Sequence, residues 1–365
     1  AEKGGYEHFM MKEMMEQPRA VANTLHPRIK DGKVVFEDEG LTDERMAKAK
    51  HIHIVGCGSA LHAGMVGRSV IEKLCRVRCT ASIASEFRYE NPIIEPDDLC
   101  IVISQSGETA DTLAAMRQAK KAGAYTVAIV NVVSSTIARE ADGVLYLWAG
   151  PEIAVATTKA YSAQLAALYL FAIKLASVRG KITAEQEKTY CDALYQLPEQ
   201  IDTMLGTKEK MQYIATRYAN RSSIFFLGRG LDYAAAMEAS LKLKEISYIH
   251  SEAYAAGELK HGTISLIEEG TLVVALATQP ELYEKTISNI REVVARGAEV
   301  VLVTGEDFDG DASYCSSVLR LPKLPHEFSA SLSIVPLQLL SYYIAVERSC
   351  DVDKPRNLAK SVTVE

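Results

Sequence analysis

Residues 51–75 read HIHIVGCGSALHAGMVGRSVIEKLC, which is an apolar run, a glycine turn and a helical stretch in succession. This order predicts a buried β-strand that passes through a tight turn into an α-helix. Two further apolar runs, LCIVI at 99–103 and TVAIVNVV at 126–133, flank another helical stretch that ends at Lys121. Alternating strands and helices of this length predict an α/β fold, with a parallel β-sheet flanked by helices on both faces.

The same pattern recurs 172 residues further along the chain. The turn VGCG at 55–58 matches LGRG at 227–230, and at the same offset residues 101–102 of the next strand match residues 273–274 without a gap. A constant offset through several elements indicates duplication of a whole domain. We therefore predict two tandem domains that share one α/β fold.

The length of the chain supports this organisation. At roughly 150 residues per domain, 365 residues fit two domains. An amphipathic helix over 7–26, interrupted at Pro18, begins the chain and is followed by a charged connecting stretch. The predicted parts are a lead-in helix and linker over 1–47, a first domain over 48–190, a second domain over 191–350 and a tail over 351–365.

The charge balance and the cysteines exclude several classes of protein. With 40 basic and 47 acidic residues the net charge is −7, so no basic field favours nucleic acid or an anionic membrane as a partner. Seven scattered cysteines form neither a disulfide framework nor a paired CxxC metal motif, and we expect no metal and no cofactor. No apolar run approaches the ~18 residues of a membrane span, and the polar start is no secretion signal. We expect a soluble, cytoplasmic protein.

The segment SQSGET at 104–109 is the strongest candidate for a binding site. It follows a buried strand and opens a helix, where hydroxyl groups and free backbone amides favour an anion. This predicts a phosphate site in the first domain, although a simple helix cap is the alternative. The second copy reads LATQPE at 276–281 and lacks the hydroxyl-rich turn. The glycine turn at 56–59 could form the opposite wall, but it lacks the GxGxxG pattern of a dinucleotide site.

A second candidate lies on the predicted helix over 237–250. Glu238, Lys242 and Glu245 are spaced i, i+4, i+7 and share one helix face. A carboxylate beside an ammonium can act as a general base. Glu–Lys pairs at this spacing also occur on many solvated helices, and spacing alone favours that ordinary interpretation.

Three single residues have ordinary default interpretations. His261 lies in a loop and could move protons near neutral pH, but a lone histidine is more often a satisfied hydrogen-bonding residue. Lys360 lies in a tail with little periodicity, for which a frayed terminus is the default. Cys57 lies in the glycine turn without an adjacent base, which favours a packing role.

Four segments together carry a resemblance to a known family: ISQSGETADTL, IASEFRY, KEISYIHSEAYAAGELKHG and DVDKPRNLAKSVTVE. They closely resemble the glutamine–fructose-6-phosphate aminotransferase family, and specifically its isomerase half with two sugar isomerase (SIS) domains. The resemblance covers essentially the whole chain. It implies two tandem SIS domains that convert fructose 6-phosphate and ammonia into glucosamine 6-phosphate, a step of amino-sugar biosynthesis.

The resemblance also implies roles for individual residues. It assigns sugar-phosphate binding to side chains of the first domain and to backbone groups that line the site: Ser104, Gln105, Ser106, Thr109, Val155 and Ala359. Glu245 would be the base that moves a proton between sugar C1 and C2, supported by Glu238 and Lys242. Lys360 would form a Schiff base with the C2 carbonyl. His261 would assist ring opening from a neighbouring subunit, which implies a homodimer with shared active sites.

Two departures from the family pattern stand out. The family's first turn commonly reads Cys-Gly-Thr-Ser, whereas this chain has Cys57-Gly58-Ser59-Ala60, so one hydroxyl is missing and Ser59 is the candidate for the sugar contact. No glutaminase domain precedes residue 1, so we expect no glutamine hydrolysis. The expected products are glucose 6-phosphate by isomerisation and, with free ammonium, glucosamine 6-phosphate.

Two other interpretations remain open. Another double-SIS phosphosugar isomerase or deglycase would share SQSGET, but the tail around Lys360 argues against it. A non-catalytic phosphosugar sensor usually pairs one SIS domain with a DNA-binding helix-turn-helix. This chain has two copies of the domain and no basic helical module.

Overall fold

The computed structural model describes residues 2–365, which form two compact units. The first unit comprises residues 16–199 and 358–365, and the second comprises residues 2–15 and 200–357. The lead-in and the tail are thus divided between the units. Helix α1 (Phe9–Met15) ends just before α2 (Gln17–Leu25), and Pro18 lies in the first turn of α2. The predicted interruption of the first helix at Pro18 is confirmed.

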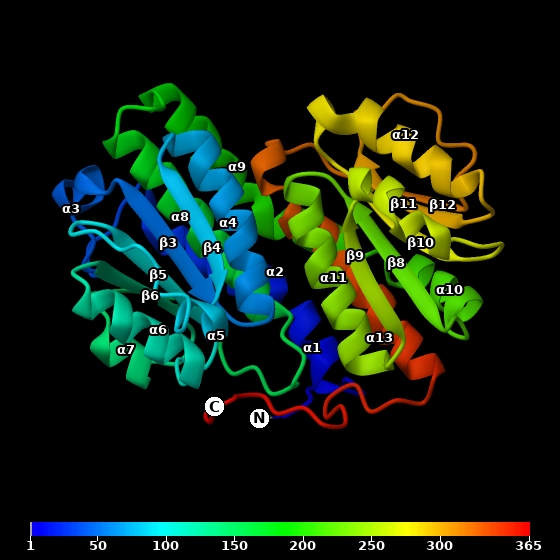
Figure 1. Ribbon diagram of the computed structural model, residues 1–365, viewed down its shortest axis with the longest axis horizontal. Coiled ribbons are helices and arrows are strands. Elements are labelled where there is room, and N and C mark those ends of the chain that lie inside the picture. The colour runs from blue at the N-terminus through cyan, green and yellow to red at the C-terminus, as the bar shows by residue number, and fades with distance from the viewer. Residues whose placement is uncertain (1) are drawn as a thin grey trace. The chain divides into compact units, whose positions relative to one another are not determined.

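A five-stranded parallel sheet in the order β4-β3-β5-β6-β7 forms the centre of the first unit (Figure 1). Its strands are β3 (His51–Gly56), β4 (Arg78–Ile83), β5 (Leu99–Ser104), β6 (Tyr125–Val130) and β7 (Gly143–Tyr146). Every residue of β5 is buried. Strands that are buried on both faces read as continuous apolar runs, which explains why LCIVI shows no polar alternation.

Helices cover both faces of this sheet. Helices α4 (Ser59–Cys75) and α8 (Lys159–Val178) pack together on one face, and α2 packs on α8. The short α5 (Ala84–Phe87), α6 (Ala110–Lys121) and α7 (Thr136–Glu140) pack on the other face, around a core that includes Val55 and Val102. The remaining elements are η1 (His26–Arg28), the antiparallel pair β1 (Ile29–Lys30) and β2 (Lys33–Val34), α3 (Asp43–Lys48), and α9 (Ala184–Leu205), which leads into the second unit.

The second unit repeats this architecture. Its parallel sheet has the order β9-β8-β10-β11-β12, with β8 (Ser223–Gly228), β9 (His250–Ala255), β10 (Leu272–Ala277), β11 (Glu299–Gly305) and β12 (Ser317–Leu321). Helices α10 (Lys208–Tyr218) and α11 (Leu231–Ser247) pack against α13 (Ala330–Glu347) on one face. Helix α12 (Tyr283–Val294) and η2 (Ala256–His261) pack on the other, and η3 (Thr263–Leu266), η4 (Pro280–Leu282) and η5 (His326–Phe328) are single turns. The predicted fold of two parallel α/β domains is confirmed.

The duplication is visible in backbone detail. Gly58 has φ 58° and ψ −127° before α4, and Gly230 has φ 59° and ψ −125° before α11. The predicted gapless match of the central strands is wrong, however. Strand β3 is separated from β8 by 172 residues, whereas β5 is separated from β10 by 173, because the two copies differ by one residue between these strands.

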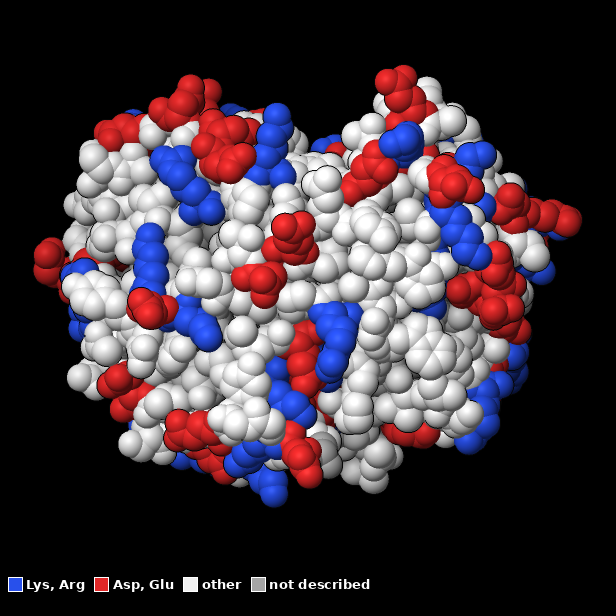
Figure 2. Space-filling view, turned by 180° about the vertical axis from the view of Figure 1, so that it is seen from behind, with Lys and Arg blue, Asp and Glu red and all other residues white. Residues whose placement is uncertain are grey.

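Two helices in the described part of the chain have the length and apolar composition of a membrane span, although no such segment was expected from the sequence. They are α8 and the segment His326–Glu347, and 83% and 89% of their most apolar windows are buried inside the structure. Helices that are apolar all round are typical of the core of a large α/β protein, and burial accounts for both. On the face drawn in Figure 2, acidic and basic side chains are interspersed, as the modest net charge predicts.

Candidate active site

The predicted phosphate turn is held by its own hydroxyl groups. At the end of β5, the Ser104 hydroxyl lies 2.9 Å from the Thr109 hydroxyl and accepts a hydrogen bond of 2.9 Å from the Gly107 N–H. The Ser106 hydroxyl accepts a hydrogen bond of 3.2 Å from the Glu108 N–H. Thr109 stands at the N-cap of α6 but makes no side-chain cap bond, so the helix-cap alternative does not describe it. The turn presents a preformed cluster of hydroxyls at a helix N-terminus, which is a favourable place for an anion.

Glycine is required inside this turn. Gly107 has φ +68°, and a Cβ atom at this position would lie 2.0 Å from the Ser135 hydroxyl oxygen. The left-handed backbone directs the Gly107 N–H back to Ser104. Gln105, the remaining predicted residue of the turn, is half-buried, and its carbonyl accepts a hydrogen bond of 3.1 Å from the Asn131 N–H.

The turn lies at the topological switch point of the first sheet. Strands β3 and β5 are neighbours, and β4 follows β3 in the chain but lies on its other side. In open α/β sheets, ligands bind outside the carboxyl ends of the strands at such a point. Ser59, the first residue of α4, follows the end of β3 and is half-buried there. The predicted pairing of the two turns is therefore supported by the topology.

Cys57 is a packing residue rather than a nucleophile. Burial raises the pKa of its thiol, and the Thr112 hydroxyl lies 3.6 Å from its sulfur. The side chain packs on the core under α6. A neutral, half-buried thiol is a poor nucleophile, as expected from the sequence.

The end of the tail is ordered against the phosphate turn. The Ser361 hydroxyl donates a hydrogen bond of 3.1 Å to the Ser106 hydroxyl, and the Val362 carbonyl accepts one of 3.1 Å from the Ala110 N–H. Ala110 is the first residue of α6, so the tail satisfies one of the free N–H groups of this helix. The Glu365 carboxylate pairs with the Arg88 guanidinium at 3.0 Å. The default interpretation of a frayed terminus is wrong for residues 358–365.

Lys360 is paired with a carboxylate that was not predicted from the sequence. Its ammonium donates a hydrogen bond to Oε1 of Glu152, whose side chain is fully buried, while 22% of the lysine side chain is exposed. Oε2 of Glu152 accepts hydrogen bonds from the N–H groups of Thr158 at 3.2 Å and Ala160 at 2.9 Å. Burial alone would raise the pKa of Glu152, but the Lys360 charge and these three hydrogen bonds together lower it. Val155 is half-buried and Ala359 is exposed.

The predicted base helix is buried, which contradicts the ordinary interpretation of a solvated face. On α11, Lys242 Nζ lies 2.7 Å from Glu245 Oε2 and 3.4 Å from Glu238 Oε1. The side chains of Lys242 and Glu238 are fully buried, and that of Glu245 is 19% exposed. Buried charges are costly unless they are paired, so three of them together on one helix make this cluster a candidate functional site. Glu245 is the member that solvent reaches.

His261 ends η2 in the second unit and is exposed. The predicted site residues therefore fall into two groups, each within one unit. The first unit holds Ser59, Ser104, Gln105, Ser106, Thr109, Val155, Ala359 and Lys360, and the second holds Glu238, Lys242, Glu245 and His261.

Comparison with known proteins assigns the family. The family model described as the SIS domain matches residues 45–174 and 217–348, which contain the two sheets. The chain belongs to the SIS domain family. The two SIS domains predicted from the sequence are confirmed.

Curated relatives with similar sequences carry one name. The chain is 55% identical over 369 residues to the glutamine–fructose-6-phosphate aminotransferase (isomerizing) of Clostridium tetani. It is 48% identical over 367 residues to the enzyme of the same name from Methanosarcina mazei. Both alignments cover 100% of this chain but only 60% and 59% of the relatives, so the chain spans about 60% of their length.

Solved structures identify the corresponding part of these relatives. The C-terminal domain of glucosamine-fructose-6-phosphate aminotransferase from Francisella tularensis is 40% identical and has a TM-score of 0.92, with 97% of this chain and 100% of that chain covered. A glucosamine-6-phosphate deaminase from Thermotoga maritima is 26% identical, with a TM-score of 0.75 and coverage of 97% and 99%. The resemblance inferred from the sequence is confirmed for the SIS-domain half of the aminotransferases.

In the second SIS domain, a carboxylate lies at the topological switch point of the sheet. Asp232 in the first turn of α11 corresponds to Ala60 at the offset of 172. Its carboxylate accepts hydrogen bonds from the Thr278 N–H at 2.8 Å and the Thr278 hydroxyl at 2.5 Å, beyond the end of β10. Burial raises the pKa of Asp232 to about 6, although the hydrogen bonds from Thr278 oppose this. This internal carboxylate lies at the position that corresponds to the candidate anion site of the first SIS domain.

Asp232 should therefore give the protein a measurable pH dependence. Its pKa rises from 3.8 to about 6 on folding, so its contribution to stability is complete below pH 4 and is lost as the pH rises through 6. In Asp232→Asn this titration is absent. When the pH is raised from 4.5 to 7, we expect the free energy of unfolding of the variant to increase by about 2 kcal/mol relative to that of the native protein. Urea titrations of both proteins at both pH values measure this change. If the difference in stability between the variant and the native protein is the same at pH 4.5 and pH 7, burial does not raise the pKa of Asp232.

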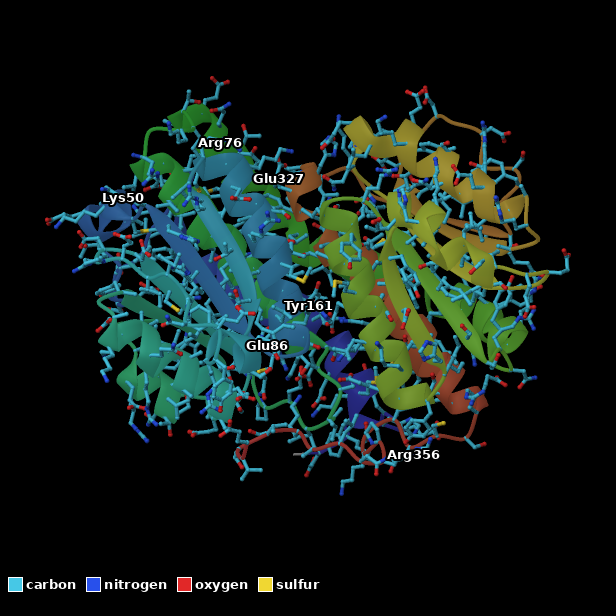
Figure 3. All side chains as sticks on the ribbon, viewed as in Figure 1. Lys50, Arg76, Glu86, Tyr161, Glu327 and Arg356 are labelled. Atoms are coloured by element: carbon cyan, nitrogen blue, oxygen red, sulfur yellow. The ribbon has the colours of Figure 1, made fainter. Side chains whose placement is uncertain are left out.

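Glu152 is the site residue that sequence reasoning missed. It lies in PEIAVATTK, an almost uncharged stretch before the apolar helix α8, whose first turn is marked by Tyr161 in Figure 3. An acidic residue in such a stretch is a weak sign of an anchored carboxylate near a helix N-terminus. Its partner Lys360 lies 208 residues away, so no local spacing connects them.

One cluster in the described chain contains three side chains of metal-ligand type: His51, His53 and Asp98. Their ligand atoms lie within 4.8 Å of one another, and the two imidazole rings stack with centroids 3.9 Å apart and planes 22° apart. His53 Nε2 lies 3.0 Å from the Asp98 carboxylate, and His51 Nε2 lies 3.1 Å from the Thr80 hydroxyl. These contacts satisfy the cluster without an ion, and the expectation of no metal site stays a prediction.

A pocket of about 520 Å³ lies at the edge of the second sheet that is opposite the carboxyl ends of its strands. It is lined by residues at the amino ends of the strands, among them Ser223, His250 and Thr271. Because ligands of open α/β sheets bind at the carboxyl ends, the size of this pocket does not make it the active site.

Proposed function

We propose that this chain is the isomerase half of a glutamine–fructose-6-phosphate aminotransferase, converting fructose 6-phosphate and ammonia into glucosamine 6-phosphate. The observation that carries the proposal is the placement of Lys360 beside buried Glu152, next in sequence to the Ser361 hydroxyl that contacts the phosphate turn. One short tail thus links an amine nucleophile to an anion site. The names of the relatives support the same substrate.

The proposed reaction divides between the two groups of residues. Ser104, Ser106 and Thr109 bind the sugar phosphate through their hydroxyls and the amides of the turn. The Lys360 amine attacks the C2 carbonyl of the open-chain sugar and releases water as the imine forms. Ammonia then replaces the Lys360 amine at C2, which frees the lysine, and Glu245 takes the proton from C1 and returns it to C2, which gives the 2-amino aldose glucosamine 6-phosphate.

The remaining parts of the proposal concern setting and assembly. His261 assists ring opening from a neighbouring subunit, so the working protein is a homodimer with shared sites. We place it in the cytoplasm, in amino-sugar biosynthesis, with sugar phosphates as its ligands and neither nucleic acid nor membrane as a partner. The exposure of His261 is compatible with a role at a subunit contact.

Borohydride trapping tests the central step. We expect incubation with fructose 6-phosphate followed by sodium borohydride to add one reduced hexose phosphate to the protein, and peptide mass spectrometry to place it on Lys360. The Schiff base is the only intermediate of this scheme that borohydride converts into a stable secondary amine. If protein that binds the sugar phosphate remains unlabelled at Lys360, the aminotransferase proposal is wrong.

A deaminase is the second candidate, because the Thermotoga maritima glucosamine-6-phosphate deaminase covers 97% of the chain at 26% identity. Both activities act on the same equilibrium, so they are distinguished by the kcat values in the two directions. A kcat for synthesis of glucosamine 6-phosphate from fructose 6-phosphate and ammonium that exceeds the kcat for ammonia release supports the aminotransferase half. A larger kcat for ammonia release from glucosamine 6-phosphate supports the deaminase.

A further inference from the structure

We propose that Glu152 is a catalytic partner of Lys360. Glu152 holds the lysine amine in place, accepts its proton during attack on the sugar carbonyl and stabilises the iminium cation that results. This inference rests on the proposed function, because it assigns a task to a neighbour of the Schiff-base lysine. Glu152 touches the reacting nitrogen directly through the hydrogen bond from Lys360 to Oε1.

Glu152 has an anchor that does not involve Lys360. Its Oε2 atom is held by the N–H groups of Thr158 and Ala160, at the start of α8. Unpaired N–H groups at a helix N-terminus favour a negative charge. The carboxylate is therefore anchored to the rigid body of the first SIS domain, while Lys360 lies on the irregular tail. A rigid carboxylate can define the position of a nucleophile on a less rigid segment.

The charge at the lysine nitrogen is the same before and after the reaction. The ammonium before the reaction and the protonated imine after it both carry one positive charge at this atom. A fully buried carboxylate stabilises both cations more strongly than a solvated one would. The neutral amine and the neutral carbinolamine that occur between these two states lose this stabilisation. The pair thus suits a reaction that begins and ends with a cation at this position.

The proton steps balance with Glu152 alone. Glu152 accepts one proton from the Lys360 ammonium, and the free amine forms the C–N bond to C2 as the C=O π electrons move to oxygen. Glu152 returns that proton to the C2 oxygen and takes one of the two protons on the new C–N nitrogen. It then gives this proton to the C2 hydroxyl, which leaves as water as the C=N bond forms. The products are the iminium, one water and the Glu152 carboxylate in its original state.

The experiment compares the native protein with Glu152→Gln, which removes the charge and keeps an oxygen for the two backbone N–H groups. We expect borohydride trapping of fructose 6-phosphate on Lys360 to fall by roughly 30-fold or more. Binding of sorbitol 6-phosphate, which has no carbonyl, should stay within a few-fold. The rate constant of trapping at saturating fructose 6-phosphate should carry this loss, while the fructose 6-phosphate concentration that gives half-maximal trapping should stay within a few-fold, because the carboxylate acts on the bond-forming step.

The control is Glu187→Gln, which removes another buried carboxylate of the same unit. Glu187 lies on α9 and accepts a hydrogen bond from the Ser177 hydroxyl at 3.1 Å. We expect native trapping, with a native rate constant at saturation, from this variant. If Glu152→Gln does not fold, Glu152→Asp replaces it, and its rate constant of trapping should fall by a smaller factor because the shorter side chain lengthens the pair.

The outcomes separate this inference from the proposed function. If the native protein binds sorbitol 6-phosphate but shows no trapped sugar on Lys360, the proposed function fails. If the native protein is trapped and Glu152→Gln is trapped equally well, the inference alone fails. It also fails if the loss of trapping in Glu152→Gln comes only from a raised half-maximal concentration of fructose 6-phosphate, with a native rate constant at saturation, since a purely structural role would give that result.

Discussion

Glu245→Gln is expected to lower isomerisation of fructose 6-phosphate to glucose 6-phosphate by roughly 10³-fold, because a positioned general base contributes about 10²–10⁴-fold. An amide in its place cannot accept the C1 proton. Glutamine is nearly the same shape and keeps an oxygen for Lys242, which lies 2.7 Å from Oε2 of Glu245. Since Glu245 is 19% exposed and Glu238 is fully buried, Glu245 is the carboxylate within reach of a ligand.

The measurement has two parts. A coupled assay follows glucose 6-phosphate, and deuterium uptake into the recovered sugar in D₂O reports the proton transfer itself. Sorbitol 6-phosphate binding should remain native, because the phosphate turn is untouched. Glu284→Gln, which changes an exposed glutamate on α12, provides the control and should retain full turnover. Undiminished deuterium uptake by Glu245→Gln would remove Glu245 from this role.

The fold could be predicted because its determinants are local. A buried strand, a two-glycine turn and a helix follow one another within 25 residues at 51–75 and again at 223–247. Positive φ at Gly58 and Gly230 requires glycine, so the two turns remained recognisable after duplication. The single-residue difference between the copies lies between Ala84 and Leu99, in a stretch with little periodicity. A one-residue change in the alignment of the two copies cannot be recognised from the sequence there.

The candidate site was predictable only where its parts are contiguous. SQSGET contains its own hydrogen-bond donors and acceptors, so these six residues are enough to predict the chemistry of the turn. The spacing of Glu238, Lys242 and Glu245 is the same on an exposed helix as on a buried one, and burial depends on α13, which lies about a hundred residues later in the chain. The pair of Glu152 and Lys360 has no local signature at all.

The stability of α11 depends on one buried ammonium. Lys242→Met is expected to reduce the free energy of unfolding at pH 7.5 by about 3–5 kcal/mol, because it removes the positive charge that two buried carboxylates share. Methionine matches the length and apolar stem of lysine, so little cavity forms. The loss comes from the carboxylates of Glu238 and Glu245, which lie 3.4 and 2.7 Å from the native ammonium. Urea titration at constant ionic strength measures the change.

The control for this variant lies two residues away on the same helix. Lys244 is exposed, so Lys244→Met makes the same chemical change outside the cluster and should alter stability by no more than about 0.5 kcal/mol. Equal stability of the two variants would mean that Lys242 is not needed to hold two carboxylates together, and the argument that this helix is built around a base would then lose its structural support.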